Sequence, residues 1–251
     1  MSNDTFQYVT RLADNVLILS QRLTQWCGKG PALEEDMALT NVALDLIGQA
    51  RLWYAYAAEI EGKGRSEDDL AYLRDAQDFH NLLLVEQPNG NYADTLMRQF
   101  LFDTWHYFLL KSLCTSSDAR IAEIAEKSLK EVSYHLRRSG DLVVRLGDGT
   151  ELSHQKMQTA LDEIWRFTGE MFQADALETR IAEQGIGPLP ARLKSAWDAH
   201  LAEVLSEATL RLPAPDAWMQ QGGKQGVHTE HMGYILAEMQ FLQRAYPGAQ
   251  W

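Results

Sequence analysis

Apolar side chains recur at helical spacing along most of this chain, and they predict a protein built from helices. From Asn3 to Trp26 the apolar positions fall three or four residues apart, which places them on one face of a helix. The run from Val16 to Leu19 is apolar all round. We therefore expect this first helix to be covered on more than one side. The pattern gives no convincing strand, internal repeat or low-complexity tract.

Turn residues divide the pattern into further helices. Glycine and proline at 28–31 separate the first helix from a second at 32–61, because glycine ends helices and proline suits a first turn. Long helices are also predicted at 91–113 and 118–146, so four long helices precede Gly147. Shorter elements, the second of uncertain type, are expected at 66–75, 81–85, 154–172, 175–185, 190–212 and 229–247.

Two predicted helix starts carry side chains that can cap them. Ser66, followed by Asp69 three residues later, resembles a capping box. Ser153 is expected to cap the helix after it. With Ser153 as the cap, Glu151 and His154 would not lie together on one helix face.

The predicted fold class is all-α, with a single domain over residues 1–251. Four long helices at 1–147 would form the core, and 148–251 would add shorter helices and a tail. A chain of 251 residues with 45% apolar composition can bury about 70–75% of its unfolded surface. Residues 213–226 have the weakest pattern, and the glycines at 222–226 suggest a mobile segment.

The charge and cysteine content limit the function and the compartment. A net charge of −12 argues against nucleic acid or an anionic membrane as the partner, because both attract basic surfaces. Cys27 and Cys114 are far apart in sequence, so we expect reduced, buried thiols. No leader pattern and no apolar run of membrane-spanning length are present, which favours a cytoplasmic protein.

The stretch from Lys130 to Arg138 carries the clearest functional signal. Val132 and His135 are three residues apart and share a helix face. In carboxylate-bridged di-iron bundles this spacing holds a glutamate and a histidine, both of which bind iron, and the motif occurs on two helices. Valine cannot bind a metal. The stretch therefore resembles a di-iron scaffold that has lost its metal.

A search for the remaining ligands is short, because the chain has seven histidines and a di-iron site needs four carboxylates and two histidines. Asp103 and His106 have the right spacing on one predicted helix. His228 and His231 lie at a loop-to-helix junction, where an exposed or capping role is more ordinary. At most one acid–histidine pair is left, so His106 and His135 are expected to be satisfied core histidines.

Several longer runs resemble one known family. They are Leu12–Asn15, Leu44–Arg51, Asn81–Asn91, Gln155–Gln158 and Gly222–His231. Over nearly its whole length the chain resembles the non-catalytic, ferritin-like subunits of bacterial ring-1,2-phenylacetyl-CoA epoxidases. The resemblance implies a ferritin-like four-helix bundle with additional C-terminal helices.

The resemblance also implies which positions once held metal. In the catalytic relative, the second helix carries Asp-Glu-x-Gly-His and the fourth carries Lys-Glu-Glu-Ser-Phe-His. Leu46 stands here for the first ligand glutamate, Gln49 for its histidine and Val132 for the second glutamate. Only His135 keeps ligand chemistry.

Two further acids are weaker candidates for the lone-carboxylate positions of such a site. Asp103 lies on the third long helix, and Asp14 lies one turn before the apolar belt of the first. A carboxylate near a bundle core can be a ligand. For Asp14, a helix-surface or hydrogen-bonded role is the more ordinary alternative.

The resemblance implies a partner of a catalyst, with no catalytic residue, metal or cofactor of its own. The expected partners are a catalytic di-iron subunit and a small bridging subunit, and a separate reductase would use FAD, an iron–sulfur cluster and NADPH. This chain has no Gly-x-Gly-x-x-Gly fingerprint and no cluster-binding cysteines, which fits the assignment of the nucleotide cofactors and the cluster to a separate reductase. Lys224, Arg137 and Arg138 could meet a CoA phosphate, although solvated surface charge is more ordinary.

Two alternative functions, each from a different class of protein, stay open. One is a catalytic ferritin-like oxygenase with an atypical di-iron site built from Asp103, His106, His135 and nearby acids. The other is a generic helical adaptor unconnected with oxygenation, which the all-α pattern and the negative charge would also fit.

Overall fold

The computed structural model describes residues 3–249, and all regular secondary structure in that range is helical. The all-α prediction is therefore confirmed. The chain divides into two compact units. The first runs as far as Pro88 and resumes at Gly222, and the second covers Asn89–Gln221.

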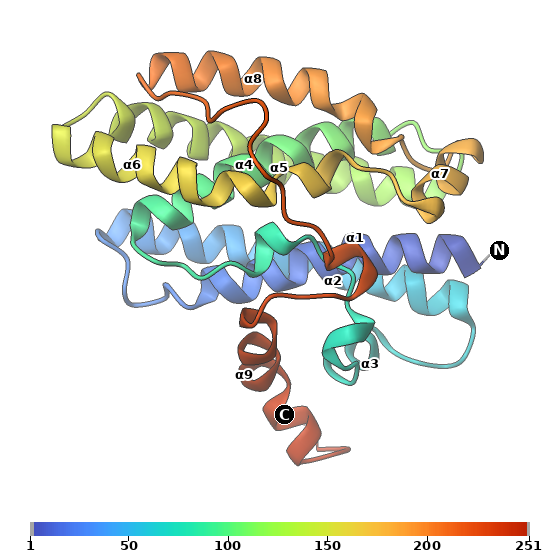
Figure 1. Cartoon of the computed structure of the whole chain (residues 1–251). Coiled ribbons are helices and arrows are strands. Elements are labelled where there is room, and N and C mark those ends of the chain that lie inside the picture. Colours follow the sequence, from blue (N-terminus) through green and yellow to red (C-terminus); the bar gives the residue numbers. More distant parts are fainter. Residues whose placement is uncertain (1–2, 250–251) are drawn as a thin grey trace. The chain divides into compact units, whose positions relative to one another are not determined.

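In the first unit, α1 (Asn3–Thr24) packs along α2 (Leu33–Glu61) (Figure 1). The apolar belt from Val16 to Leu19 is buried throughout, which confirms that α1 is covered on more than one side. The C-cap of α2 is Gly62, whose φ of 66° lies in the left-handed region that glycine adopts without steric penalty.

Short elements and a last helix complete the first unit. They are α3 (Glu67–Tyr72), η1 (Ala76–Asp78), η2 (Leu83–Glu86), η6 (Gly223–Gln225) and α9 (His231–Ala245). The predicted capping box is confirmed, because Ser66 Oγ accepts a hydrogen bond from Asp69 N–H at 3.1 Å and the Asp69 carboxylate accepts one from Ser66 N–H at 2.7 Å. The run of uncertain type at 81–85 leads into the short η2, in which every side chain is buried.

The glycine-rich segment at 222–226, whose mobility stays a prediction, has a defined conformation. This segment forms a compact turn, in which Val227 N–H donates a hydrogen bond to Gly222 O at 2.9 Å. A Cβ on Gly226 would collide with the carbonyl oxygen of Gln77. The glycine is therefore needed for a close backbone approach rather than for flexibility.

In the second unit, α4 (Tyr92–Leu113) packs along α5 (Ala119–Gly147), and two further helices, α6 (Glu151–Ile164) and α8 (Lys194–Glu207), pack against this pair (Figure 1). The shorter elements are η3 (Trp165–Phe167), η4 (Gly169–Phe172), α7 (Ala176–Glu183) and η5 (Pro190–Leu193). Apolar residues at helical spacing on α4 and α5 form the contact between them.

Helix α6 begins earlier than predicted. Its N-cap is Thr150, whose hydroxyl accepts a hydrogen bond from Ser153 N–H at 3.1 Å. Threonine and serine are both good caps, and in the structure Thr150 is the residue that caps the helix. Glu151 and His154 therefore do lie on one helix, contrary to the prediction. The helix also ends at Ile164, and the chain continues as two 3₁₀ turns to Phe172.

The cysteines and the helix lengths test two further expectations. Both cysteines are free thiols, but Cys27 is exposed and Cys114 is partly exposed, so the prediction of buried thiols is wrong. Cys27 lies in the turn after α1, outside the apolar pattern of that helix. Within residues 3–249, no helix combines the length and apolar character that crossing a bilayer requires.

Candidate functional site

The stretch that carries the strongest sequence signal lies on α5, inside the second unit. Val132 and His135 are 0% and 1% exposed, as expected for two positions on the buried face of one helix. The valine fills its position with hydrocarbon. This face of α5 therefore offers one imidazole and no carboxylate at the Glu-x-x-His spacing.

Asp103 on α4 is the carboxylate of this buried group. Its two oxygens accept hydrogen bonds from Gln99 Nε2 at 2.6 Å and from Ser139 Oγ, on α5, at 2.8 Å. Burial raises the pKa of Asp103 to about 6, although the charge of His135 and the two hydrogen bonds favour the ionised form. The carboxyl group is thus a protonatable, hydrogen-bonded member of the core.

His106 lies one turn after Asp103 on α4 and is also buried. Burial lowers its pKa to about 3, and the charge of His135 adds to this effect. Its ring packs against Phe102 and Trp105, with centroids 5.1 and 6.4 Å away, and its Nδ1 has no hydrogen-bond partner. The structure thus brings Asp103, His106 and His135 into one buried group whose histidine at 106 is neutral.

The positions predicted on α2 lie in the first unit. Leu46 and Gln49 are three residues apart and 0% and 1% exposed, so they share the buried face of α2. An aliphatic side chain and an amide stand where the resemblance places a carboxylate and an imidazole. Neither offers the anionic or imidazole donors that bridged iron requires.

Asp14 on α1 is fully buried and binds a guanidinium group. Its carboxylate forms an ion pair with Arg74, and it accepts hydrogen bonds from Tyr54 Oη at 2.6 Å and from His80 N–H at 2.8 Å. The guanidinium also lies 4.0 Å from the ring centroid of Phe79. A cation therefore already neutralises this carboxylate, and the residues around it do not fit a metal ion.

The protonation of this group follows from its burial and its charges. Burial raises the pKa of Tyr54 well above its ordinary value, and the charge of Asp14 adds to the rise. For Arg74, burial opposes the charged form, but the charge and hydrogen bond of Asp14, together with Tyr54 and Asp78, outweigh it and the pKa is raised. The hydroxyl therefore stays a donor, and the guanidinium stays charged, throughout the physiological range.

A second buried pair in this unit, Glu86 and His228, was not predicted. His228 Nδ1 lies 3.1 Å from Glu86 Oε2, and its Nε2 donates to Phe79 O at 2.9 Å. Thr229 N–H donates to the other carboxylate oxygen of Glu86 at 2.8 Å. Burial disfavours charge on His228, but the contacts with Glu86 and Phe79 and the charge of Asp14 together outweigh it and raise the pKa. The exposed or capping role expected for His228 is therefore wrong.

The sequence held a partial signal for this pair. Glu86 lies in the run Asn81–Asn91 and His228 in the run Gly222–His231, two of the runs on which the family resemblance was based. Their separation by more than a hundred residues hid the contact. Arg74 gave no such signal, because it follows a short helix with no motif of its own.

His154, which follows Glu151 at the same spacing, has a structural partner. His154 Nδ1 lies 2.8 Å from Gly147 O, and Glu151 is exposed on the first turn of α6. Within residues 3–249, no group of three or more His, Cys, Asp and Glu side chains has an arrangement that could hold a metal ion.

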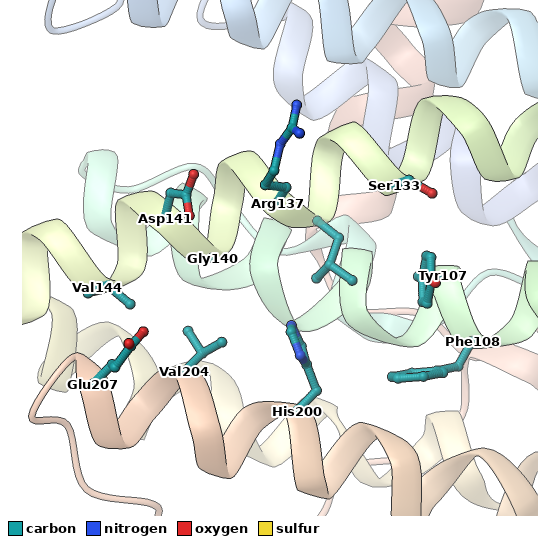
Figure 2. Close-up of a pocket in the computed structure, with 11 residues that line it drawn as sticks. Tyr107, Phe108, Ser133, Arg137, Gly140, Asp141, Val144, His200, Val204 and Glu207 are labelled. Carbon is teal, nitrogen blue, oxygen red and sulfur yellow. The ribbon is translucent and has the colours of Figure 1, made fainter.

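A cavity of about 470 Å³ lies within the second unit, lined by residues of α4, α5 and α8 (Figure 2). Tyr107 and Phe108 supply its aromatic wall, and the His200 ring points from α8 toward α5. His200 Nε2 is buried without a hydrogen-bond partner, and burial lowers the pKa of this histidine. The cavity could therefore take an apolar group that bears one hydrogen-bonding atom.

The charges around this cavity do not suit a phosphate group. Asp141 and Glu207 line it, and its one cationic lining residue, Arg137, points away from it (Figure 2). Clustered cations are what anionic phosphates require. Lys224, another candidate for such a contact, is only 5% exposed, so its expected role as a solvated surface charge is wrong.

Comparisons with known proteins give a consistent result. The family model described as "Phenylacetic acid catabolic protein" matches residues 1–251. A relative from Escherichia coli (strain K12), which is a subunit of the 1,2-phenylacetyl-CoA epoxidase, is 52% identical over 249 residues, which cover 99% of this chain and all of the relative. The similarity extends through both compact units.

Proposed function

This chain belongs to the family of phenylacetic acid catabolic proteins, and from this membership we propose that it is the non-catalytic subunit of a phenylacetyl-CoA epoxidase. Its all-α structure is the ferritin-like fold of that family. In this role the chain pairs with the di-iron catalytic subunit and stabilises it, and the pair acts in aerobic phenylacetate breakdown in the cytoplasm.

The observation that carries the proposal is the chemistry at the positions that the family resemblance assigns to metal ligands. Leu46 and Val132 are both 0% exposed, so both glutamate positions of the Glu-x-x-His pattern are filled by hydrocarbon. Burying each side chain stabilises the fold by roughly 1.5–3 kcal/mol. A buried carboxylate without its metal would instead be costly.

The ion pair of Asp14 with Arg74 supports the same conclusion. A di-iron ligand must offer its charge to the metal, whereas this carboxylate is neutralised by a guanidinium and by hydrogen bonds from Tyr54 and His80. The chain's own residues thus use their charges to hold the first unit together. We propose that this chain binds no cofactor.

The remaining chemistry would belong to other subunits. Di-iron in the catalytic subunit would supply oxygen activation, and FAD, an iron–sulfur cluster and NADPH would serve a reductase. A small bridging subunit would complete the assembly. The acidic surface of this chain, with a net charge of −12, fits a protein partner better than nucleic acid.

The proposal is tested by purifying the chain alone and with its catalytic partner. We expect less than stoichiometric iron in the lone chain, a stable complex with the partner, and epoxidation of phenylacetyl-CoA only when the catalytic subunit is present. Two irons in the lone chain together with unaided substrate oxidation, or no complex at all, would contradict the proposal.

One observation favours a second candidate, a catalytic oxygenase with an atypical site. Asp103, His106 and His135 form a buried group, and His106 Nδ1 has no hydrogen-bond partner. If this group binds iron, His106→Ala and His135→Ala should each remove metal and activity from the reconstituted enzyme. Unchanged activity in both variants would exclude this candidate.

A further inference from the structure

Three large apolar side chains of α2 are exposed on one face. Leu33, Met37 and Leu44 are 71%, 57% and 59% exposed. At 3.6 residues per turn they lie within about 40° of arc of one another. Single exposed apolar residues are ordinary, but an aligned set on one helix is typical of a contact surface. This set, continued by Gly48 and Ala55, is called the outer face of α2.

Gly48 lies on the same face, and no described residue packs closely against it. Glycine weakens a helix interior relative to alanine, and the usual compensation is close approach of another element. A Cβ added at Gly48 would meet no atom within 4 Å. By contrast, a Cβ added at Gly147 would lie 2.8 Å from the Cβ of Ala208. A close approach at Gly48 would therefore come from outside the described residues.

Charge along the border of the outer face indicates the kind of partner. Glu34, Asp45 and Glu59 lie along one edge of it, whereas Arg51 lies in line with Leu33 and is paired with Glu67 at 3.2 Å. An antiparallel, two-fold pair of α2 helices would set two acidic edges against each other. With a net charge of −12 on each chain, a second copy is a poor occupant.

We propose that a helix of the catalytic subunit docks on the outer face of α2, with lysine or arginine side chains opposite its acidic edge. This inference rests on the proposed function. The face spans about 33 Å from Leu33 to Ala55 at about 1.5 Å per residue. A strip about 10 Å wide gives less than half of the roughly 800 Å² that each partner of a stable complex buries. The docked helix is therefore the centre of a larger interface.

The test measures the affinity of the full-length chain for the purified catalytic subunit. Leu44→Arg would bury an unpaired charge, and Gly48→Leu would block the close approach, so each should weaken binding at least about 10-fold. Leu152→Arg is the matched control, because Leu152 is 62% exposed on α6. It should bind as the wild type does. Circular dichroism would show that every variant keeps its helix content.

A second arm tests the acidic edge. The double variant Glu34→Lys, Glu59→Lys should lower the affinity at low salt and reduce its dependence on ionic strength. The control, Glu163→Lys with Glu183→Lys, changes the net charge equally at two exposed positions on α6 and α7. It should have a much smaller effect.

The outcomes separate this inference from the proposed function. If the wild-type chain does not bind the catalytic subunit, the proposed function fails. If the wild type binds and Leu44→Arg and Gly48→Leu bind equally well, the docking surface is wrong while the function stands. A homodimer of the isolated chain that Leu44→Arg dissociates would also overturn the inference, in favour of a second copy.

Discussion

Arg74 and Asp14 form an ion pair that has almost no access to solvent. Their side chains are 9% and 0% exposed, so water cannot replace either partner. A buried pair of this kind need not be more stable than two apolar residues of the same size. Removing one partner, however, leaves a charge buried without compensation.

The first prediction concerns this pair. Arg74→Met should lower the free energy of unfolding by about 3–5 kcal/mol, because Asp14 would stay buried without its counter-charge. Denaturant unfolding followed by circular dichroism measures the change. The control is Arg51→Ala, which breaks an ion pair whose arginine side chain is 76% exposed and should cost about 0–1 kcal/mol. Equal effects of the two variants would contradict the prediction.

Asp103 and His106 give the protein two opposite pH dependences. The pKa of Asp103 is raised to about 6, so its stabilising effect is complete below about pH 4 and is lost as the pH rises through 6. The pKa of His106 is lowered to about 3. Its stabilising effect is therefore complete above about pH 6.5 and is lost as the pH falls toward 3.

The second prediction uses these signs. Relative to the wild type, Asp103→Asn should gain up to about 3 kcal/mol of stability as the pH rises from 4 to 7, at about 1.4 kcal/mol per pKa unit. His106→Gln should change in the opposite direction and gain stability as the pH falls over the same range. Unfolding free energies at several pH values measure both slopes. Slopes of the same sign would show that the assigned protonation states are wrong.

At the scale of the helices, two glycines in long helices have different reasons to be there. Gly48 in α2 has no atom within 4 Å of its missing Cβ. Gly147, the last residue of α5, lies directly against Ala208. Gly48 therefore lowers helix stability, and no packing contact among the described residues compensates for it. Gly147, by contrast, is required by packing.

The third prediction follows from this difference. In the isolated chain, Gly48→Ala should raise the free energy of unfolding by about 1 kcal/mol, because alanine favours the helix and meets no neighbour. Gly147→Ala should lower it by about 1–3 kcal/mol, because the added methyl group overpacks the contact with Ala208. Denaturant unfolding of both variants measures the two effects. A loss of stability in Gly48→Ala would mean that a neighbour is present after all.

The helices were also the level at which sequence prediction succeeded most fully. The four long ones agree with prediction to within about two residues, because apolar spacing, caps and glycine stops all indicate the same limits. The start of α6 was predicted wrongly, because Thr150 and Ser153 can each cap a helix and local sequence does not choose between them.

At the scale of the whole molecule, the C-terminal segment returns to the first unit. The contact is made by His228 with Glu86 and Phe79, and by Thr229 N–H with Glu86. The raised pKa of His228 gives the sign of its pH dependence. Its charged contact is complete below about pH 6.5 and is lost as the pH rises through the raised value.

The fourth prediction tests this contact. At pH 6, Glu86→Gln should make residues 222–230 about 10-fold more susceptible to limited proteolysis, because a charge-assisted hydrogen bond worth about 1–3 kcal/mol is lost. The difference from the wild type should shrink at pH 9. Glu183→Gln, at an exposed position on α7, is the control. Cleavage of 222–230 at an unchanged rate would contradict the prediction.

The sequence predicted which positions of the candidate site are buried better than it predicted which residues contact one another. Val132, Leu46 and Gln49 were predicted from helical spacing and from the family resemblance, and the structure places all three on buried faces. That these positions once held metal stays a prediction. The partners of Asp14 could not be predicted, because Arg74 and His80 reach it from a segment about sixty residues further along the chain.

The sequence by itself determined the all-α class, the long helices and the absence of carboxylates at the two positions that the family resemblance assigns to ligand glutamates, because these depend on residue identity and on spacing within one helix. Tertiary structure alone decided which polar side chains meet: Asp14 with Arg74, Glu86 with His228, and Asp103 with Ser139. It also decided that no atom of residues 3–249 lies within 4 Å of a Cβ added at Gly48. Helical periodicity fixes the direction of a side chain around its own axis, but packing between distant segments fixes what that side chain contacts.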